Sequence, residues 1–164
     1  MSILKVNGKK NVVLLVILIV LIEVGGFVSG FISNSGSAQY LDFIKPAFAP
    51  PGWVFPVVWT ILYLLMAIAL YRIILLGSYG KNINKAILYF IIQLVLNYLW
   101  SIIFFRFNLY GIAFLEILLM LLFILLTTVE FCKLDKKAAL LMVPYILWVC
   151  FAAVLNLSIW MLNK

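Results

Sequence analysis

The side chains of this chain that could take part in chemistry are mainly aromatic, because the sequence contains no histidine. The absence of histidine excludes the usual general base, the usual proximal haem ligand and most zinc sites. Cys132 and Cys150 have no spacing that indicates a metal site or a disulfide framework. We therefore expect no metal and no required cofactor. Stacking on aromatic faces and redox chemistry of indole side chains remain.

Residues 45–63, KPAFAPPGWVFPVVWTILY, interleave prolines with aromatic residues and contain four of the five prolines. Proline fixes the backbone and removes a hydrogen-bond donor, and Pro56 suits the first turn of a helix. These features predict a stiff lid from Pro46 to Trp53 that leads into a helix. On that helix Trp59 and Tyr63 are four residues apart and therefore share a face.

Two further segments carry polar and aromatic residues at helical spacing. The first stripe contains Asn97, Trp100, Ser101 and Phe104. The second follows Pro144 and contains Tyr145, Trp148, Ala152 and Asn156. Tryptophan and tyrosine also anchor helices at the membrane boundary, and asparagine in hydrocarbon also bonds between helices. Structural packing and ligand contact both remain open as explanations of each stripe.

The elements that position these residues follow from the composition. Of the 164 residues, 68% are hydrophobic and 10% charged, and the mean hydropathy is +1.26. Five apolar runs, at 12–32, 54–76, 86–105, 109–129 and 138–162, each approach the ~20 residues that cross a bilayer as a helix. The sequence therefore predicts an all-α integral membrane protein, one domain over residues 1–164, with a lid loop at about 33–53. A nucleic-acid partner is not expected, because the basic residues lie between apolar runs.

Basic residues predict how the bundle is oriented. Nine fall on one side: Lys5, Lys9, Lys10, Arg72, Lys81, Lys85, Lys133, Lys136 and Lys137. Three fall on the other: Lys45, Arg106 and Lys164. This asymmetry predicts a cytoplasmic N-terminus and an outer C-terminus. The alternative is a cleaved signal peptide with a poor cleavage site at residues 36–38.

Two acids and a glycine pair stand out within the apolar runs. Glu23 and Glu116 would be costly as charges in hydrocarbon and should face the bundle interior. Gly26 and Gly30 form a GxxxG spacing, which allows close approach of another helix. That helix belongs either to the same bundle or to a second copy in a homodimer.

Three ordered motifs make the chain resemble the translocator protein family, called tryptophan-rich sensory protein (TspO) in bacteria and peripheral benzodiazepine receptor in animals. The family pattern KPxxxPPxWxFPxxWTxLY is matched from Lys45 to Tyr63. Asparagine and tryptophan before paired phenylalanines are matched by Asn97, Trp100, Phe104 and Phe105. The pattern PYxxWxxFAxxLN is matched from Pro144 to Asn156. The resemblance covers essentially the whole chain.

The resemblance implies a five-helix bundle of the bacterial cytoplasmic membrane, often a homodimer, with a pocket beneath the first loop. Its family ligands are porphyrins such as protoporphyrin IX, haem, and isoquinoline or benzodiazepine drugs. Carried over by motif, the ligand-binding residues are Pro46, Trp53, Trp59, Tyr63, Asn97, Trp100, Ser101, Phe104, Tyr145, Trp148 and Ala152.

Three functions follow from this resemblance. The first is a membrane receptor or sensor that binds porphyrins and takes part in tetrapyrrole handling or stress regulation. The second is light-dependent degradation of protoporphyrin IX, with Trp59 and Trp148 as the catalytic residues. The third is a porphyrin transporter, in which Glu23 and Glu116 are the intramembrane acids available to relay protons.

Overall fold

A computed structural model describes residues 3–33 and 37–163 of the chain. Its helices are α1 (Val12–Ser33), α2 (Ser37–Asp42), α3 (Val54–Gly77), α4 (Asn84–Ser101), the π-helical turn η1 (Ile102–Arg106), α5 (Tyr110–Leu134) and α6 (Lys136–Leu162). Five spans, with η1 continuing α4, are long and apolar enough to cross a membrane. No β-strand occurs in the described ranges. The predicted all-α bundle of five membrane helices is confirmed.

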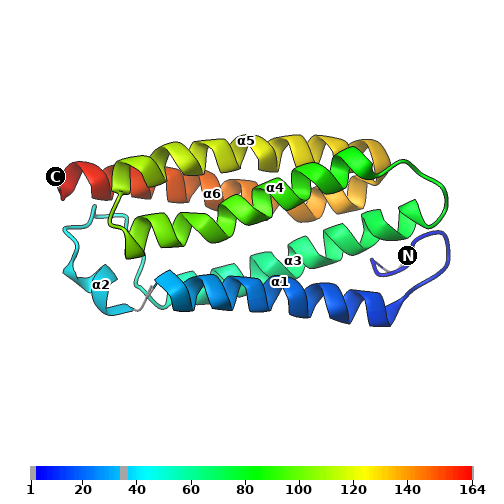
Figure 1. Ribbon diagram of the computed structural model, residues 1–164, viewed down its shortest axis with the longest axis horizontal. Helices are drawn as coiled ribbons and strands as arrows, with labels where there is room; N and C mark the ends of the chain where they lie inside the picture. Colours follow the sequence, from blue (N-terminus) through cyan, green and yellow to red (C-terminus); the bar gives the residue numbers. More distant parts are fainter. Residues whose placement is uncertain (1–2, 34–36, 164) are drawn as a thin grey trace.

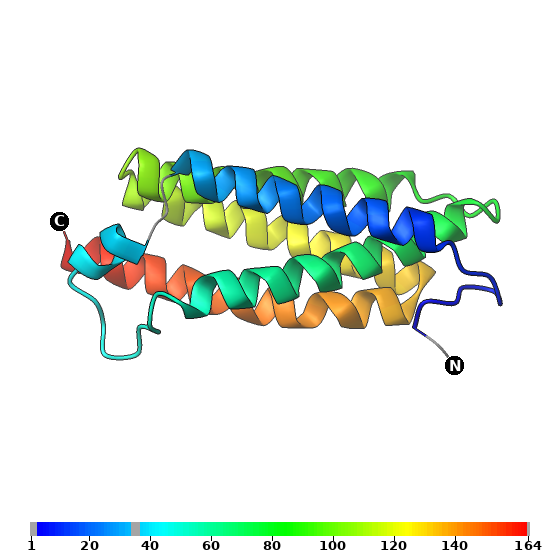
Figure 2. The same cartoon turned by 90° about the horizontal axis from the view of Figure 1, so that it is seen from below.

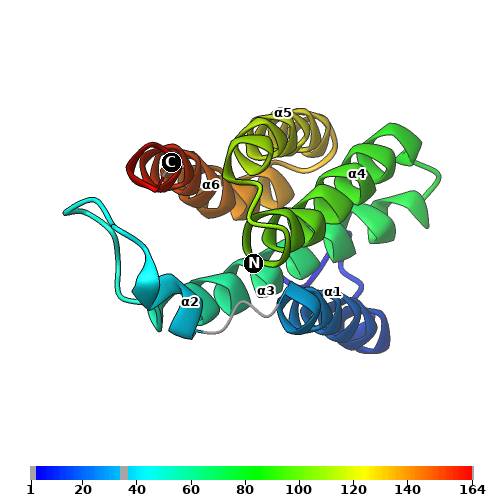
Figure 3. The same cartoon turned by 60° about the vertical axis from the view of Figure 1, so that its left-hand side comes forward.

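The five long helices form a closed ring. Each packs on two neighbours, in the order α1, α3, α6, α5, α4 and back to α1. Figure 3 shows this order nearly end on, with α4 between α5 and α1. Because helices satisfy their own backbone hydrogen bonds, such a ring can stand in hydrocarbon and still leave room between its members for side chains or a ligand.

The two ends of the bundle differ. The N-terminal segment, the α3–α4 connection and the α5–α6 connection lie at one end (Figure 1). The other end holds the C-terminus, α2 and the loop that leads into α3 (Figure 2). The nine basic residues counted above belong to the three segments of the first end or to the adjoining helix ends. We call it the basic end.

Two helix ends differ from the sequence prediction by more than two residues, each for a physical reason. The helix α5 continues to Leu134 instead of ending near 129. The apolar run stops before the charged residues Glu130 and Lys133, but Lys133 Nζ pairs with Glu130 Oε1 at 2.8 Å, one turn away on the same helix, and the helix continues through both. The run predicted as one helix to residue 105 changes to a π-helical turn at Ile102, and such a turn alters the register of the residues within it.

A buried ion pair fixes the basic end. Arg72 Nη2, on α3, lies 2.5 Å from Asp135 Oδ2. Asp135 also caps α6, because its Oδ1 accepts a hydrogen bond from the backbone N–H of Lys137 at 2.9 Å. Arg72 donates as well to the backbone carbonyl of Ile3. The pair therefore ties α3 to the α5–α6 turn and to the N-terminal segment.

Candidate functional site: a pocket under the lid

A cavity of about 840 Å³ lies between α1, α3, α4, η1 and α6, with α2 at its mouth. The described part of α5 contributes no lining residue. Phe27 and Phe31 of α1 and Trp53 before α3 border the cavity, yet they are 75%, 80% and 68% exposed. The cavity therefore opens to the outside of the bundle beside α1 and below the lid.

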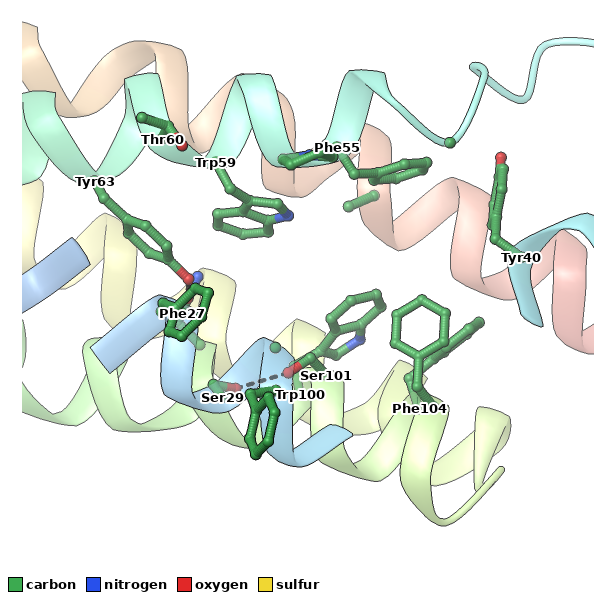
Figure 4. Close-up of a pocket in the computed structure, with 18 of the residues that line it drawn as sticks. Phe27, Ser29, Tyr40, Phe55, Trp59, Thr60, Tyr63, Trp100, Ser101 and Phe104 are labelled. Atoms are coloured by element: carbon green, nitrogen blue, oxygen red, sulfur yellow. Dashed lines mark hydrogen bonds between the residues drawn. The ribbon is translucent and has the colours of Figure 1, made fainter. Parts of the chain in front are cut away.

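Aromatic side chains form two facing walls. Figure 4 shows Phe55 and Trp59 on α3 projecting toward Trp100 on α4 and Phe104 on η1. The rings of Trp100 and Phe104 stack with centroids 5.1 Å apart, and the ring of Trp59 lies 5.5 Å from that of Tyr63. Two such faces across a gap suit a flat, apolar ligand, which binds by stacking and by surface burial.

A chain of hydrogen bonds holds the inner end of the cavity. The Tyr63 hydroxyl donates to Asn97 Oδ1 at 2.7 Å, and Asn97 Nδ2 donates to the Tyr145 hydroxyl at 2.8 Å. Tyr145 then donates to Gln93 Oε1 at 2.9 Å. The amide that could have been a ligand contact is thus also the junction between α3, α4 and α6, as expected for polar groups in hydrocarbon.

The outer half of the cavity has its own polar contacts. Trp100 Nε1 donates to Asn156 Oδ1 at 3.1 Å, and Asn156 Nδ2 donates to the Tyr110 carbonyl at 2.9 Å. At the α1 side of the cavity, the hydroxyls of Ser29 and Ser101 form a hydrogen bond of 2.7 Å that joins α1 to α4 (Figure 4). The bond from Trp100 Nε1 to Asn156 holds the indole ring in place at the wall of the cavity.

Glycines let α1 approach the bundle closely. A methyl group on Gly26 would lie 2.9 Å from Tyr63 Cζ, and one on Gly25 would lie 2.6 Å from Tyr98 Oη. Each is far below ordinary contact distance. Gly26 of the GxxxG spacing therefore packs inside the bundle against Tyr63, whereas Gly30 lines the cavity.

The lid is tied down at several points. The Tyr40 hydroxyl donates to the Pro50 carbonyl at 2.9 Å, and burial raises the pKa of Tyr40 above its ordinary value. Lys45 Nζ donates to the Tyr40 carbonyl at 2.8 Å. Asn163, after α6, exchanges two bonds with the backbone of Ile44, at 3.0 and 2.9 Å. The prolines thus act together with specific anchors.

The structure brings together eight of the eleven predicted ligand residues around the cavity: Trp53, Trp59, Tyr63, Asn97, Trp100, Ser101, Phe104 and Ala152. Pro46, Tyr145 and Trp148 do not line it. Pro46 accepts a bond from the Ala49 N–H within the lid. Tyr145 has no exposed surface and supports Asn97 from behind.

Trp148 differs most from its expected place. Its ring packs against those of Phe55 and Phe151, with ring centroids 6.0 and 5.4 Å away. Between Trp148 and Trp59 lies a separate space of only about 20 Å³, room for one water and not for a ring system. The partner that faces Trp59 across the large cavity is Trp100, so the two tryptophans expected to act together are not on one ligand surface.

Several lining residues were not on the predicted list. They are Glu23, Val24, Gly26, Phe27, Ser29, Gly30 and Phe31 of α1, Tyr40, Gly52, Phe55, Pro56 and Thr60, Phe105, and Leu155, Asn156 and Ile159 of α6. A signal for the α1 face was present in the sequence, because Glu23, Gly26 and Gly30 follow the i, i+3, i+7 spacing of one helix face. Within the described ranges no three cysteine or acidic side chains converge on a metal site.

Comparison with known proteins agrees with the motifs. A model of the TspO/MBR family matches residues 16–161. The tryptophan-rich protein TspO of Chlorobaculum tepidum is 39% identical over 142 residues, 87% of this chain and 90% of that protein. The tryptophan-rich protein TspO of Archaeoglobus fulgidus is 36% identical over 93% and 99% of the two chains, and the human translocator protein 33% identical over 84% and 83%. This multi-pass membrane protein belongs to the TspO/MBR family.

Proposed function

We propose that the protein is a membrane receptor that binds a porphyrin, such as protoporphyrin IX, in the cavity beneath the lid. The observation that carries the proposal is the cavity of about 840 Å³ between the faces of Trp59 and Trp100. Its volume is within the ~300–1,000 Å³ of small-molecule sites, and its lining is mostly apolar with a few fixed polar groups. A flat tetrapyrrole has the shape and apolar surface to occupy it.

The polarity of the cavity favours one orientation of such a ligand. At the lid end Lys45 lies beside the pocket residue Tyr40, with Nζ 5.0 Å from the ring centroid. At the inner end the charged residue of the lining is Glu23. Propionate groups would therefore point toward the lid, and the apolar edge of the ring would lie between the tryptophans.

We also propose that the basic end faces the cytoplasm, in line with the excess of lysine and arginine there. The lid and the mouth of the cavity would then lie toward the outer side of the cytoplasmic membrane. A ligand would reach the cavity from that side or from the outer leaflet.

The binding proposal is tested by titrating protoporphyrin IX into the purified protein and following the absorption band of the porphyrin. We expect saturable binding, and Trp59→Phe and Trp100→Phe should each weaken it about threefold to tenfold, as loss of an aromatic contact does. Trp160→Phe is the matched control, because Trp160 packs against Phe114 and does not line the cavity. Equal affinity in all four proteins would show that this cavity is not the porphyrin site.

A further inference from the structure

The charged groups of the cavity are unevenly distributed. Among the lining residues that the structure describes, Glu23 is an acid and there is no lysine or arginine. Glu23 lies near the middle of α1, on the same helical face as Gly26 and Gly30, both of which line the cavity. A carboxyl group therefore borders the inner end of an otherwise aromatic pocket.

Glu23 has no hydrogen-bond or ion-pair partner in residues 3–33 and 37–163. The hydroxyl donors beside it are already used elsewhere. Tyr63 donates to Asn97 at 2.7 Å, and the Tyr98 hydroxyl donates to the carbonyl of Ile22 at 2.8 Å. The fold thus leaves this carboxyl group available to a group that enters the cavity.

Because Glu23 lies within a membrane span, the charge of a ligand group beside it affects binding strongly. An isolated carboxylate is costly in the membrane interior, and a cation that comes to lie beside it offsets the cost. The attraction is also stronger there than in water, because the local dielectric constant is lower. A second carboxylate at the same place would instead be repelled.

We propose that Glu23 makes the inner end of the pocket a site for the protonated amine of a flat aromatic ligand. Such a ligand would place its rings between Trp59 and Trp100 and its ammonium group beside Glu23. This inference rests on the proposed function, since it uses the same cavity, and adds a second ligand class: cationic aromatic amines.

A matched pair of probes tests the inference. 9-(Aminomethyl)anthracene carries an ammonium group at neutral pH, and 9-(hydroxymethyl)anthracene has the same rings and a similar size without the charge. The protein is placed in discs of neutral phosphatidylcholine, and binding is measured as saturable energy transfer from tryptophan to anthracene that protoporphyrin IX displaces. We expect Glu23→Gln to weaken the amine about tenfold, the value of one charged hydrogen bond, and to change the alcohol by less than twofold.

Glu116→Gln is the control variant. Glu116 is the other acid within the apolar helices, and its carboxylate oxygens are buried away from the cavity, without a partner in the described chain. It should leave the affinity for both probes unchanged. Equal amine affinity in wild type and Glu23→Gln, or an equal loss for amine and alcohol, would refute the inference alone if protoporphyrin still binds. Failure of porphyrin and both anthracenes to bind the wild type would refute the proposed function as well.

Discussion

Replacing Gly26 by alanine should damage the pocket through a single side chain, Tyr63. The added methyl group would lie 2.9 Å from Tyr63 Cζ and closer still to Cε2, whereas carbon atoms prefer about 3.5–4.0 Å. The ring must therefore recede by more than about 0.6 Å. A shift of that size takes the 2.7 Å bond from Tyr63 to Asn97 outside the 2.5–3.0 Å range of hydroxyl hydrogen bonds.

Two effects are expected from this displacement. Overpacking should lower the free energy of unfolding by about 1–3 kcal/mol, and the lost interhelical bond adds about 0.6 kcal/mol. Because Tyr63 also lines the cavity, the affinity for protoporphyrin IX should fall about threefold to tenfold. Thermal unfolding in detergent measures the first effect, and porphyrin titration of the folded variant measures the second.

Gly25→Ala is a control with a similar steric overlap on the same helix. Its methyl group would meet Tyr98, at 2.6 Å from Oη, and Tyr98 does not line the cavity. We expect Gly25→Ala to destabilise the protein to a similar extent and to lower porphyrin affinity less than Gly26→Ala does, because Tyr98 meets the cavity wall only through its edge-on contact with Tyr63, with ring centroids 6.0 Å apart. Our reasoning would be wrong if Gly26→Ala bound porphyrin as tightly as the wild type, or if both variants lost affinity equally.

Two further predictions concern the basic end. Arg72→Met should lower the free energy of unfolding by about 3–5 kcal/mol, because it leaves Asp135 buried without its partner, and Arg72→Met with Asp135→Leu should be less destabilising than Arg72→Met alone. Chemical unfolding of the two variants decides this, and a double variant no more stable than the single one would contradict it. A membrane-impermeant maleimide should label exposed Cys132, in the last turn of α5, in inverted vesicles and not in intact cells, whereas Cys150 lies within the membrane span and should stay unlabelled. Labelling of Cys132 in intact cells would overturn the proposed orientation.

The five membrane helices could be predicted from the sequence because hydrocarbon imposes one strong rule. A segment must be apolar for about 20 residues and must satisfy its own backbone, and few soluble sequences do so. The stripe from Asn97 to Phe104 was also predictable, and all four of its residues line the cavity. For Asn97, Trp100 and Ser101 on α4 the helical period predicts the face, and the polar residue indicates that it points inward, whereas Phe104 reaches the same cavity from the π-helical turn η1.

The places of Tyr145 and Trp148 could not be predicted in the same way. Helical spacing gives the side of α6 on which a residue lies, but not its depth along the cavity. The cavity touches the outer part of α6, from Ala152 to Ile159, whereas Tyr145 and Trp148 lie one to two turns further in. At that depth Phe55 and Trp59 of α3 fill the space. Only the relative tilt and height of two helices, which hydropathy does not encode, decide which tryptophan meets a ligand.

The helix α1 forms part of the cavity wall because of the contact that brings it close to α3, that of Gly26 with Tyr63. Gly26 is small so that Tyr63 can lie against the helix backbone, and this position lets Tyr63 reach Asn97 on α4. Close packing and the shape of the inner pocket are therefore one feature. A homodimer seam that used the Gly26 face would compete with Tyr63 for the same space and would have to open the pocket to form. If a second copy binds α1, it must use the opposite face of the helix, and ligand binding and association can then occur together.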